Sequence, residues 1–392
     1  MKRNLLRSRD SHSEERVGFI ELFFDLVFVF AVTQVSHAII LHPDPLGFAQ
    51  AALLFLAIWW VWVDTAWVTN WLDVRHMPVR FLLFALMGAA MVMTISLPQA
   101  FADRALPFAL AYVGIQLGRH GFMLLALVCH NHDNFLNFVR ITGWSLIEAP
   151  FWIAGALAGD AATRMALWSA ALAIVSTGPI VAFRVPGLGR SETRTWDVEG
   201  HHFSERCGLF IIIALGESIL VTGAAFGQTD WAAPAIAAFA SAFIGTIAMW
   251  WLYFDIGAQR AAEALQQDKD PGRMARLAYT YFHIPIVAGI IVTAASDSMA
   301  VTHPGGRADI GAVAALLGGP ALYLFGNLIF KRTSADYYPL SHMAGLGILA
   351  AVAPFATALT PLALSFAATA VLMLVAGWEL VSLRETRKAL KA

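Results

Sequence analysis

Charged side chains are scarce in this chain of 392 residues: Asp, Glu, Lys and Arg make up 14% of it, and the formal net charge is -1. A soluble domain usually has about 25% charged residues, so this composition excludes an ordinary soluble protein. The absence of a basic excess argues against nucleic acid as a partner. Two cysteines, Cys129 and Cys207, are too few for a disulfide scaffold.

Sequence motifs for common chemistry are also missing. No Walker, Gly-x-Ser-x-Gly or Gly-x-Gly-x-x-Gly pattern occurs, and the histidines at 201–202 and at 130 and 132 lack the spacing of a strong metal site. We therefore expect neither a bound metal nor a cofactor. The polar N-terminal residues are not followed by a short apolar stretch with a cleavage site, so we expect no removable signal peptide.

What the chain has in abundance is apolar sequence, at 58% of its residues. A helix that crosses a bilayer needs about 20 apolar residues. We predict an all-α integral membrane protein with about twelve transmembrane helices, in contact with the lipid bilayer. The expected spans are roughly 18–40, 48–69, 80–98, 105–128, 138–158, 165–183, 205–225, 232–254, 276–298, 309–330, 340–358 and 361–382.

Two sequence patterns occur twice, about 190 residues apart. The pattern Glu-Arg-x-Gly at 15–18 recurs at 205–208, and Trp59–Asp64 (WWVWVD) resembles Trp250–Asp255 (WWLYFD). We predict an internal duplication: two six-helix repeats in parallel orientation, at 18–183 and 205–383. A cytoplasmic linker at 184–204 would join them, between an N-terminal tail at 1–17 and a C-terminal tail at 384–392.

The distribution of basic residues predicts the orientation in the membrane. Under the twelve-span prediction only Arg104, Arg164 and Arg307 fall in outer loops, and the other Lys and Arg residues lie on the inner side or in inner helix halves. Cytoplasmic segments carry the excess of Lys and Arg, so both termini should be cytoplasmic. The sequence leaves homo-oligomerisation open.

Acidic residues inside apolar helices are costly and usually functional. Glu21 and Asp25 are four residues apart and therefore share a helix face, with Asp25 the deeper of the two. Asp64 lies about a turn and a half from the inner end of the second predicted span, at a depth where it could meet Asp25. Glu148 and Glu217 lie near the middle of their spans.

Arg119 is the one basic residue deep inside a predicted span, and we expect it to pair with a buried acid. The principal candidates for proton coupling or transport are Asp25, Asp64, Glu148 and Glu217. The alternative is that Arg119 forms a purely structural ion pair with Glu148 or Glu217.

Four further residues are secondary candidates. Arg206 belongs to the repeated Glu-Arg-x-Gly pattern, and Asp255 is the repeat counterpart of Asp64 near the inner surface. Glu21 could be a helix-start acid at the interface. His283, followed by Pro285, could relay protons or bind a backbone carbonyl that the proline leaves free.

Three segments resemble a known protein family. Glu21–Val29 (ELFFDLVFV), Glu205–Ile219 (ERCGLFIIIALGESI) and Trp250–Asp255 are similar to patterns of the bacterial low temperature requirement A (LtrA) family, and the resemblance extends over nearly the whole chain. It implies a multi-pass protein of the bacterial cytoplasmic membrane, linked by name to growth at low temperature. It implies no established reaction and no catalytic residues.

A second similarity concerns the first predicted span. Arg16 followed by Phe24–Phe28 (FDLVF) is similar to the first helix of lysosomal two-repeat potassium channels, which carry Arg and Phe-Ser-Asp there and have six helices per repeat. In this chain Phe replaces the Ser, and the Arg-to-Asp spacing is longer. The resemblance implies a cation channel as an alternative function.

The favoured hypothesis is a proton-linked transporter of an unidentified small solute or ion, with a route between the two halves lined by the four buried acids. The alternatives are a cation channel and an enzyme that acts on a lipid or isoprenoid at the inner leaflet through Asp25 and Asp64. A regulatory or packing role in cold membranes is a fourth hypothesis. Transport is favoured over an enzyme because no nucleophile or metal-binding constellation is present.

Overall fold

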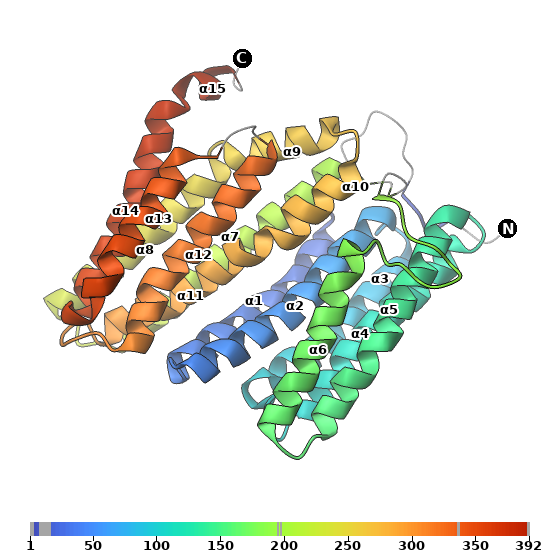
Figure 1. The fold of residues 1–392 in the computed structure, drawn as a ribbon, viewed down its shortest axis with the longest axis horizontal. Helices are drawn as coiled ribbons and strands as arrows, with labels where there is room; N and C mark the ends of the chain where they lie inside the picture. The colour runs from blue at the N-terminus through green and yellow to red at the C-terminus, as the bar shows by residue number, and fades with distance from the viewer. Residues whose placement is uncertain (1–3, 8–16, 194–195, 197, 335–337, 390–392) are drawn as a thin grey trace. The chain divides into compact units, whose positions relative to one another are not determined.

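The computed structural model describes residues 4–7, 17–193, 196, 198–334 and 338–389. Within these ranges the chain is almost entirely helical, and no segment forms a strand of a sheet. The predicted all-α class is confirmed (Figure 1).

Long helices follow one another through the chain, with short connections. In the first half they are α1 (Phe19–Leu41), α2 (Pro45–Trp71), α3 (Met77–Ser96), α4 (Ala105–Leu127), α5 (His132–Leu157) and α6 (Ala161–Ile180). In the second half they are α7 (Gly200–Gly227), α8 (Ala233–Phe254), α11 (His283–Thr302), α12 (Ile310–Ser334), α13 (Leu340–Val352) and α14 (Pro361–Ser382). The shorter elements are α9 (Gly257–Gln267), α10 (Pro271–Met274), a π-helical stretch (Ala275–Tyr281) and α15 (Arg384–Ala389).

Ten helices in the described ranges are long and apolar enough to cross a membrane. Helices α5 and α6 coincide with two further predicted spans but are not among the ten. The prediction of a multi-pass membrane protein is confirmed, while twelve membrane crossings in two repeats stay a prediction.

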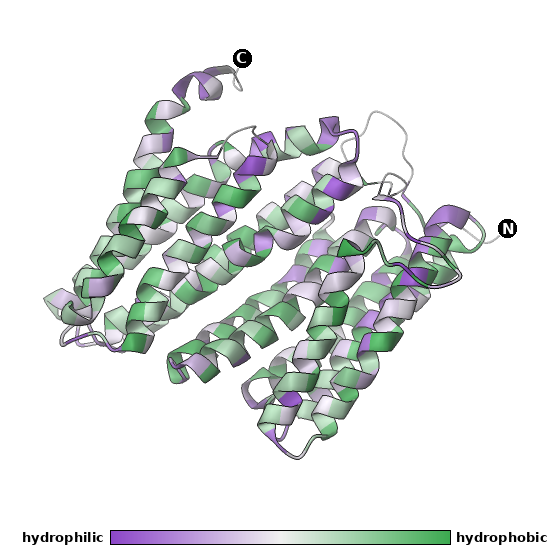
Figure 2. Ribbon diagram, viewed as in Figure 1, coloured by the Kyte–Doolittle hydropathy of each residue, from purple (hydrophilic) through white to green (hydrophobic). Residues whose placement is uncertain are grey.

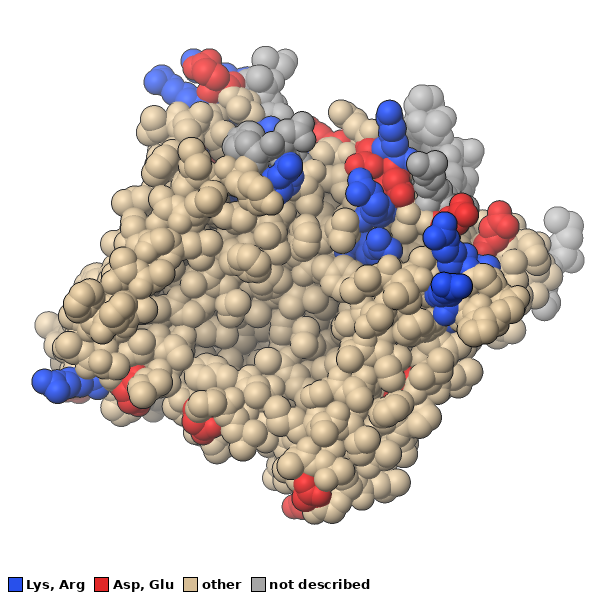
Figure 3. Space-filling view, viewed as in Figure 1, with Lys and Arg blue, Asp and Glu red and all other residues tan. Residues whose placement is uncertain are grey.

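The surface of the helices supports contact with lipid. Large hydrophobic side chains are exposed along their outer faces, including Phe81, Phe84, Ile236, Ile247 and Phe366. Hydrophobic residues run along the helices, and hydrophilic residues gather at their ends (Figure 2). On the visible faces of the helices, charged side chains likewise lie mainly near the ends (Figure 3). Exposed apolar surface of this extent is typical of a membrane-embedded protein.

Helix boundaries differ from the sequence prediction at two places that matter for the site. Helix α7 begins at Gly200 rather than near 205, so the end of the predicted linker is helical and His202 lies on the same helix as Arg206. Helix α11 continues to Thr302, beyond the predicted end at 298. Of the repeated Glu-Arg-x-Gly pattern, Glu15 and Arg16 lie outside the described residues.

The chain divides into two compact units. Unit 1 comprises Met1–Gln34, Ala52–Arg206 and Gln266–Arg276; unit 2 comprises Val35–Ala51, Cys207–Leu265 and Leu277–Ala392. In unit 1, α3 packs on α4, α4 on α5 and α5 on α6. In unit 2, α11 and α12 lie side by side, and α14 packs against α8, α12 and α13 (Figure 1).

Candidate functional site: buried charge clusters in the membrane helices

A buried group of charged side chains lies in unit 1, where α1, α2 and the first residues of α7 meet. Arg206 donates from Nη1 to Glu21 Oε1 at 3.0 Å and from Nη2 to Asp25 Oδ1 at 2.7 Å. Glu21, Asp25, Arg206 and His202 are each 0% exposed. We call these four residues the acid–arginine cluster. Removing charges from water costs several kcal/mol per ion, so this arrangement needs close pairing to persist.

Helical spacing explains how the cluster is assembled. Glu21 and Asp25 are one turn apart on α1, and His202 and Arg206 are one turn apart on α7, so each pair projects from one face of its helix. From α2, Thr69 Oγ1 accepts a third hydrogen bond from Arg206, at 3.1 Å.

Trp62, also on α2, completes the surroundings of Asp25. Its Nε1 donates to Asp25 Oδ1 at 2.8 Å. The guanidinium carbon of Arg206 lies 5.9 Å from the centroid of the Trp62 ring, within the range of a cation–π interaction.

The two carboxylates of the cluster have different surroundings. Both oxygens of Glu21 are engaged, because Oε1 accepts from Arg206 while Oε2 accepts from the Gly18 amide at 2.8 Å and from Arg7 Nη2 at 3.4 Å. Asp25 accepts both its hydrogen bonds on Oδ1, and its buried Oδ2 has no hydrogen-bond partner among the described residues. A proton can therefore be added to Oδ2 without breaking either hydrogen bond of Asp25.

His202 connects Glu21 to α2. Its Nε2 lies 3.0 Å from Glu21 Oε1, and its Nδ1 lies 3.3 Å from Asn70 Nδ2. The backbone of Glu199 orients the Asn70 amide. Asn70 Oδ1 accepts from the Glu199 N–H, and Asn70 Nδ2 donates to the Glu199 carbonyl. The Asn70 nitrogen thus faces Nδ1, while Nε2 faces both Glu21 Oε1 and the guanidinium of Arg7, whose Nη2 lies 3.0 Å away.

The unequal bonding of the two acids predicts unequal effects of neutralising them. In Glu21→Gln, an NH₂ group replaces one of two oxygens that both accept hydrogen bonds, so donor faces donor. In Asp25→Asn, the amide oxygen can replace Oδ1 as the acceptor, and the NH₂ group takes the place of Oδ2, which has no partner among the described residues. We expect Glu21→Gln to lower the free energy of unfolding by at least ~1.5 kcal/mol more than Asp25→Asn, because hydrogen bonds to charged groups contribute about 1.5–3 kcal/mol. Denaturant unfolding in mixed micelles measures the difference, and equal losses would contradict this assignment.

A second buried charge cluster in unit 1 surrounds Arg119 on α4. Arg119 Nη2 donates to Asp64 Oδ2 at 3.2 Å, and its Nη1 donates to the Val61 carbonyl at 3.0 Å and to Thr65 Oγ1 at 2.9 Å. Gln116 bonds to both Arg119 and Asp64. Arg119 pairs with an acid, as expected, but the partner is the partly exposed Asp64 rather than the buried Glu148 or Glu217.

Glu148 on α5 lies beside this second cluster. It lies within electrostatic range of both Asp64 and Arg119. The side chain is 1% exposed, and its buried Oε2 has no hydrogen-bond partner in the ranges that the structure describes. Arg119 thus has two acids within electrostatic range and is ion-paired with one of them.

The remaining sequence candidates lie in unit 2. Glu217 is 2% exposed on α7, and the neighbouring Ser218 contacts Thr246 of α8. His283 accepts from the Tyr253 hydroxyl at 2.7 Å and donates from Nδ1 to the Ala278 carbonyl at 2.8 Å, so both ring nitrogens have partners within the protein.

Asp255, at the end of α8, pairs with Arg387 of α15. This hydrogen bond raises the pKa of the Arg387 guanidinium above its ordinary value. Because Arg387 is part of a short helix beyond α14, this pair resembles an end-of-helix contact more than a membrane-centre site.

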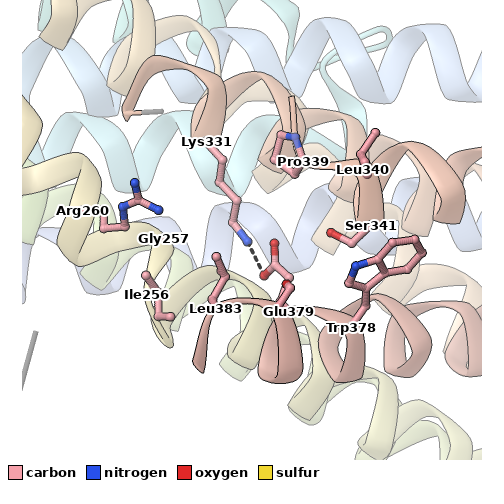
Figure 4. Close-up of a pocket in the computed structure, with 11 residues that line it drawn as sticks. Ile256, Gly257, Arg260, Lys331, Pro339, Leu340, Ser341, Trp378, Glu379 and Leu383 are labelled. Carbon is pink, nitrogen blue, oxygen red and sulfur yellow. Dashed lines mark hydrogen bonds and ion pairs between the residues drawn. The ribbon is translucent and has the colours of Figure 1, made fainter. Parts of the chain in front are cut away.

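Unit 2 also contains a cavity of about 240 Å³ between the ends of α8, α12 and α14 and the starts of α9 and α13 (Figure 4). Lys331 Nζ donates to Glu379 Oε2 at 2.7 Å on its wall, and Arg260 lines it as well. Trp378 and Leu340 form an apolar part of the cavity wall. A wall with both signs of charge and an apolar side suits a small amphiphilic or zwitterionic molecule.

Sequence reasoning missed the roles of His202, Trp62, Lys331 and Glu379. The histidines at 201–202 were considered only as metal ligands and judged unsuitable, and nothing in their spacing indicates that His202 contacts Glu21. Within the described ranges, no group of three or more His, Cys, Asp or Glu side chains is placed to hold a metal. Acidic and basic residues near predicted helix ends, such as Lys331 and Glu379, are not recognisable from the sequence as functional residues, because side chains at such positions are usually solvated.

Comparison with known proteins gives a consistent result. A family model described as "Bacterial low temperature requirement A protein (LtrA)" matches residues 16–377. An uncharacterized protein of Rhizobium meliloti (strain 1021) is 41% identical over 389 residues, which cover 97% of this chain and 93% of the relative. No solved structure matches the chain significantly.

Proposed function

The chain belongs to the bacterial low temperature requirement A family of membrane proteins, and from this premise we propose that it is a proton-linked transporter of a small solute or ion. The observation that carries the proposal is the acid–arginine cluster, whose four side chains are fully buried in helices of membrane-spanning character. Ionisable groups in such helices are expensive and commonly mark proton relays and ion pathways.

Asp25 is the proton-binding group in this proposal. Its Oδ2 is available for a proton, while Glu21 is held by donors on both oxygens. Protonation of Asp25 removes the charge that Arg206 Nη2 faces and leaves Glu21 as the only anionic partner of Arg206 in the cluster. The ion pair between α1 and α7 would weaken, and this change can be coupled to movement of one helix against the other.

The second cluster supplies a further step. Arg119 pairs with Asp64 and lies within electrostatic range of Glu148. We propose that Arg119 exchanges between the two acids, and that protonation of the released acid accompanies the exchange. Helix α2 would connect the steps, since it carries Trp62 and Thr69 toward the acid–arginine cluster and Asp64 and Thr65 toward Arg119.

The duplicated architecture is part of the same proposal. Helix α4 carries Tyr112, Gln116 and Arg119, and α12 carries Tyr323, Asn327 and Lys331 in a similar order. In unit 1 Arg119 pairs with Asp64, while in unit 2 Lys331 pairs with Glu379 and interacts with Asp255, the sequence counterpart of Asp64. These parallels support two six-helix repeats, and the distribution of Lys and Arg supports our placing them in the cytoplasmic membrane with both termini cytoplasmic.

The role at low temperature is also a proposal, supported by the family description. A carrier that must change conformation has an activation barrier, and its rate falls as temperature falls. A cell that depends on the transported solute would then need this protein most in the cold.

Proton flux in proteoliposomes tests the proposal. The purified chain is reconstituted with a pH-sensitive dye in the lumen, and classes of small solutes and ions are added outside in turn. We expect at least one class to cause proton movement that Asp25→Asn abolishes. The matched control is Asp103→Asn, an exposed acid in the turn before α4, which should leave the flux unchanged.

Two outcomes would overturn the proposal. Proton movement that is equal in the wild type and in Asp25→Asn would remove the acid–arginine cluster from the mechanism. A steady ionic current without solute-dependent proton movement would indicate a cation channel instead.

A further inference from the structure

Unit 2 contains a buried acid whose surroundings differ from those of the ion-paired acids described above. Asp297 lies on α11, five residues before the helix ends at Thr302, and is 5% exposed. Its Oδ2 is buried without a hydrogen-bond partner, and no charged group in the described part of the chain acts on it. Glu21 and Asp25 share Arg206, Asp64 has Arg119, and Glu379 has Lys331.

An uncompensated carboxylate in such a position needs either a proton or a bound cation. Five residues of helix correspond to about 7.5 Å, which places Asp297 below the end of α11 and within an apolar helix bundle. Keeping a bare charge there costs at least ~2.5–3.5 kcal/mol. The choice between a proton and a cation depends on what else surrounds the carboxylate.

Residues from four helices, α8, α11, α12 and α14, line a small cavity next to Asp297. The cavity has a volume of about 10 Å³, enough for one particle the size of a water molecule. Residues with hydroxyl groups line it from α11 and α14, and Ser241 of α8 is hydrogen-bonded to two of them. The lining hydroxyl residues are Thr293, Ser296, Ser365 and Thr369.

Two of these hydroxyl groups have free bonding capacity toward a ligand. Thr293 Oγ1 is buried and has no hydrogen-bond partner among the described residues. Ser365 Oγ donates to Ser241 Oγ at 3.0 Å, which leaves its own lone pairs available. Together with Asp297 Oδ2, these atoms are hard oxygen ligands of the kind that alkali and alkaline-earth cations prefer.

A proline removes the helical donor of one backbone carbonyl in a residue that lines the cavity. Pro320 lies inside α12 and has no N–H to donate to the carbonyl of Leu316, four residues earlier. Both residues line the cavity. In transporters, carbonyl groups released from helical bonding in this way can coordinate Na⁺.

Two glycines provide the space for the hydroxyl groups. A Cβ atom on Gly319 would lie 2.6 Å from Thr293 Oγ1, and a Cβ on Gly245 would lie 3.1 Å from Thr369 Oγ1. Any larger residue at 319 would push against the Thr293 side chain and backbone. The sequence therefore keeps α8 and α12 free of side-chain atoms where these hydroxyl groups approach.

From this arrangement we infer that Asp297, the surrounding hydroxyl groups and the Leu316 carbonyl form a binding site for one monovalent metal cation, for which Na⁺ is the best match. A single carboxylate balances a single positive charge, whereas a divalent ion would leave one charge uncompensated in the bundle. The cavity has room for one small ion without its hydration shell. This site lies entirely in unit 2 and goes beyond the proposed proton-linked transport, since Na⁺ binding is measured without any solute or proton flux.

Equilibrium binding of radioactive ²²Na⁺ to the full chain in lipid nanodiscs tests the inference. Choline is the control cation and should not displace ²²Na⁺ from the site. We expect saturable binding of one ion per chain. Asp297→Asn removes the charged ligand and should weaken the affinity by roughly tenfold or more. Thr293→Val keeps the shape and removes one hydroxyl, and it should weaken the affinity by less.

The control is Ser298→Ala, a buried neighbour on α11 that does not line the cavity, and it should bind as the wild type does. Absence of saturable binding to the wild type would overturn the inference and indicate a protonated Asp297. Equal affinity in Asp297→Asn would place the ion elsewhere and would also overturn it. If Asp297→Asn does not elute as a monodisperse protein, Thr293→Val and Ser365→Ala decide, and wild-type affinity in both variants contradicts the site.

Discussion

Replacement of Arg206 by Leu is expected to lower the free energy of unfolding by about 3–5 kcal/mol, because it leaves two fully buried carboxylates without their shared cation. The lost contacts include the cation–π interaction with Trp62 and the hydrogen bond to Thr69. Denaturant unfolding in mixed micelles, followed by tryptophan fluorescence, measures the change.

The chain offers a matched control and a rescue for this variant. Arg387→Leu removes a cation from the partly exposed pair between α15 and Asp255 at the end of α8, and it should cost about 1 kcal/mol or less. Adding Asp25→Asn to Arg206→Leu removes one of the two uncompensated charges and should restore part of the lost stability. An Arg206→Leu variant as stable as Arg387→Leu would show that the cluster is not held by the ion pairs seen in the structure.

Gly289→Ala is expected to cause the second large effect, through the contact between α11 and α12. A Cβ atom at position 289 would lie 2.4 Å from the backbone nitrogen of Tyr323 and 2.7 Å from its Cα. Backbone atoms cannot move aside as the end of a side chain can, so the two helices must separate. Close packing through small residues is a main source of helix association in membranes, and we expect a loss of about 1–3 kcal/mol or more.

Gly377→Ala on α14 is the matched control, because a Cβ at that position has no heavy atom within 4 Å in the described structure. In a helix, alanine is more favourable than glycine by up to about 1 kcal/mol. We therefore expect the two Gly→Ala variants to change stability in opposite directions in the same unfolding assay. A Gly289→Ala variant with unchanged stability would contradict the close helix approach.

Much of the fold could be predicted from the sequence because membrane helices follow a simple rule. An apolar run of sufficient length must form a helix in lipid, where every backbone polar group needs an internal partner. The helices accordingly coincide with the predicted spans to within a few residues over most of the chain. The exceptions, such as the start of α7 at Gly200, occur where polar residues such as His202 are buried by tertiary contacts that hydropathy does not register.

The site could be predicted in part. Spacing on one helix placed Glu21 and Asp25 on a common face, and depth in the membrane identified Arg119 and Asp64 as candidates. Which acid meets which base depends on how helices pack, and no periodicity within one helix determines this. Arg206 was recognised through a repeated pattern, yet its bonds to Glu21 and Asp25 join residues more than 180 positions apart in the sequence.

Asp297 shows a different reason for a missed residue. Asp297 is not among the predicted candidates, and it lies one residue before the predicted end of its span at 298, where an acid is usually solvated. Helix α11 continues for four residues beyond Ser298, and this extension places the carboxylate inside the bundle. An error of one helical turn in a boundary can therefore hide a buried acid.

The central claim is that Asp25 exchanges a proton inside the acid–arginine cluster. Infrared difference spectroscopy of the chain reconstituted in lipid, recorded as the pH is lowered, detects the C=O stretch of a newly protonated carboxyl group. We predict that one such band is present in the wild type and in Asp103→Asn and is missing in Asp25→Asn. A spectrum that is the same in the wild type and in Asp25→Asn over the whole pH range in which the protein stays folded would contradict the claim.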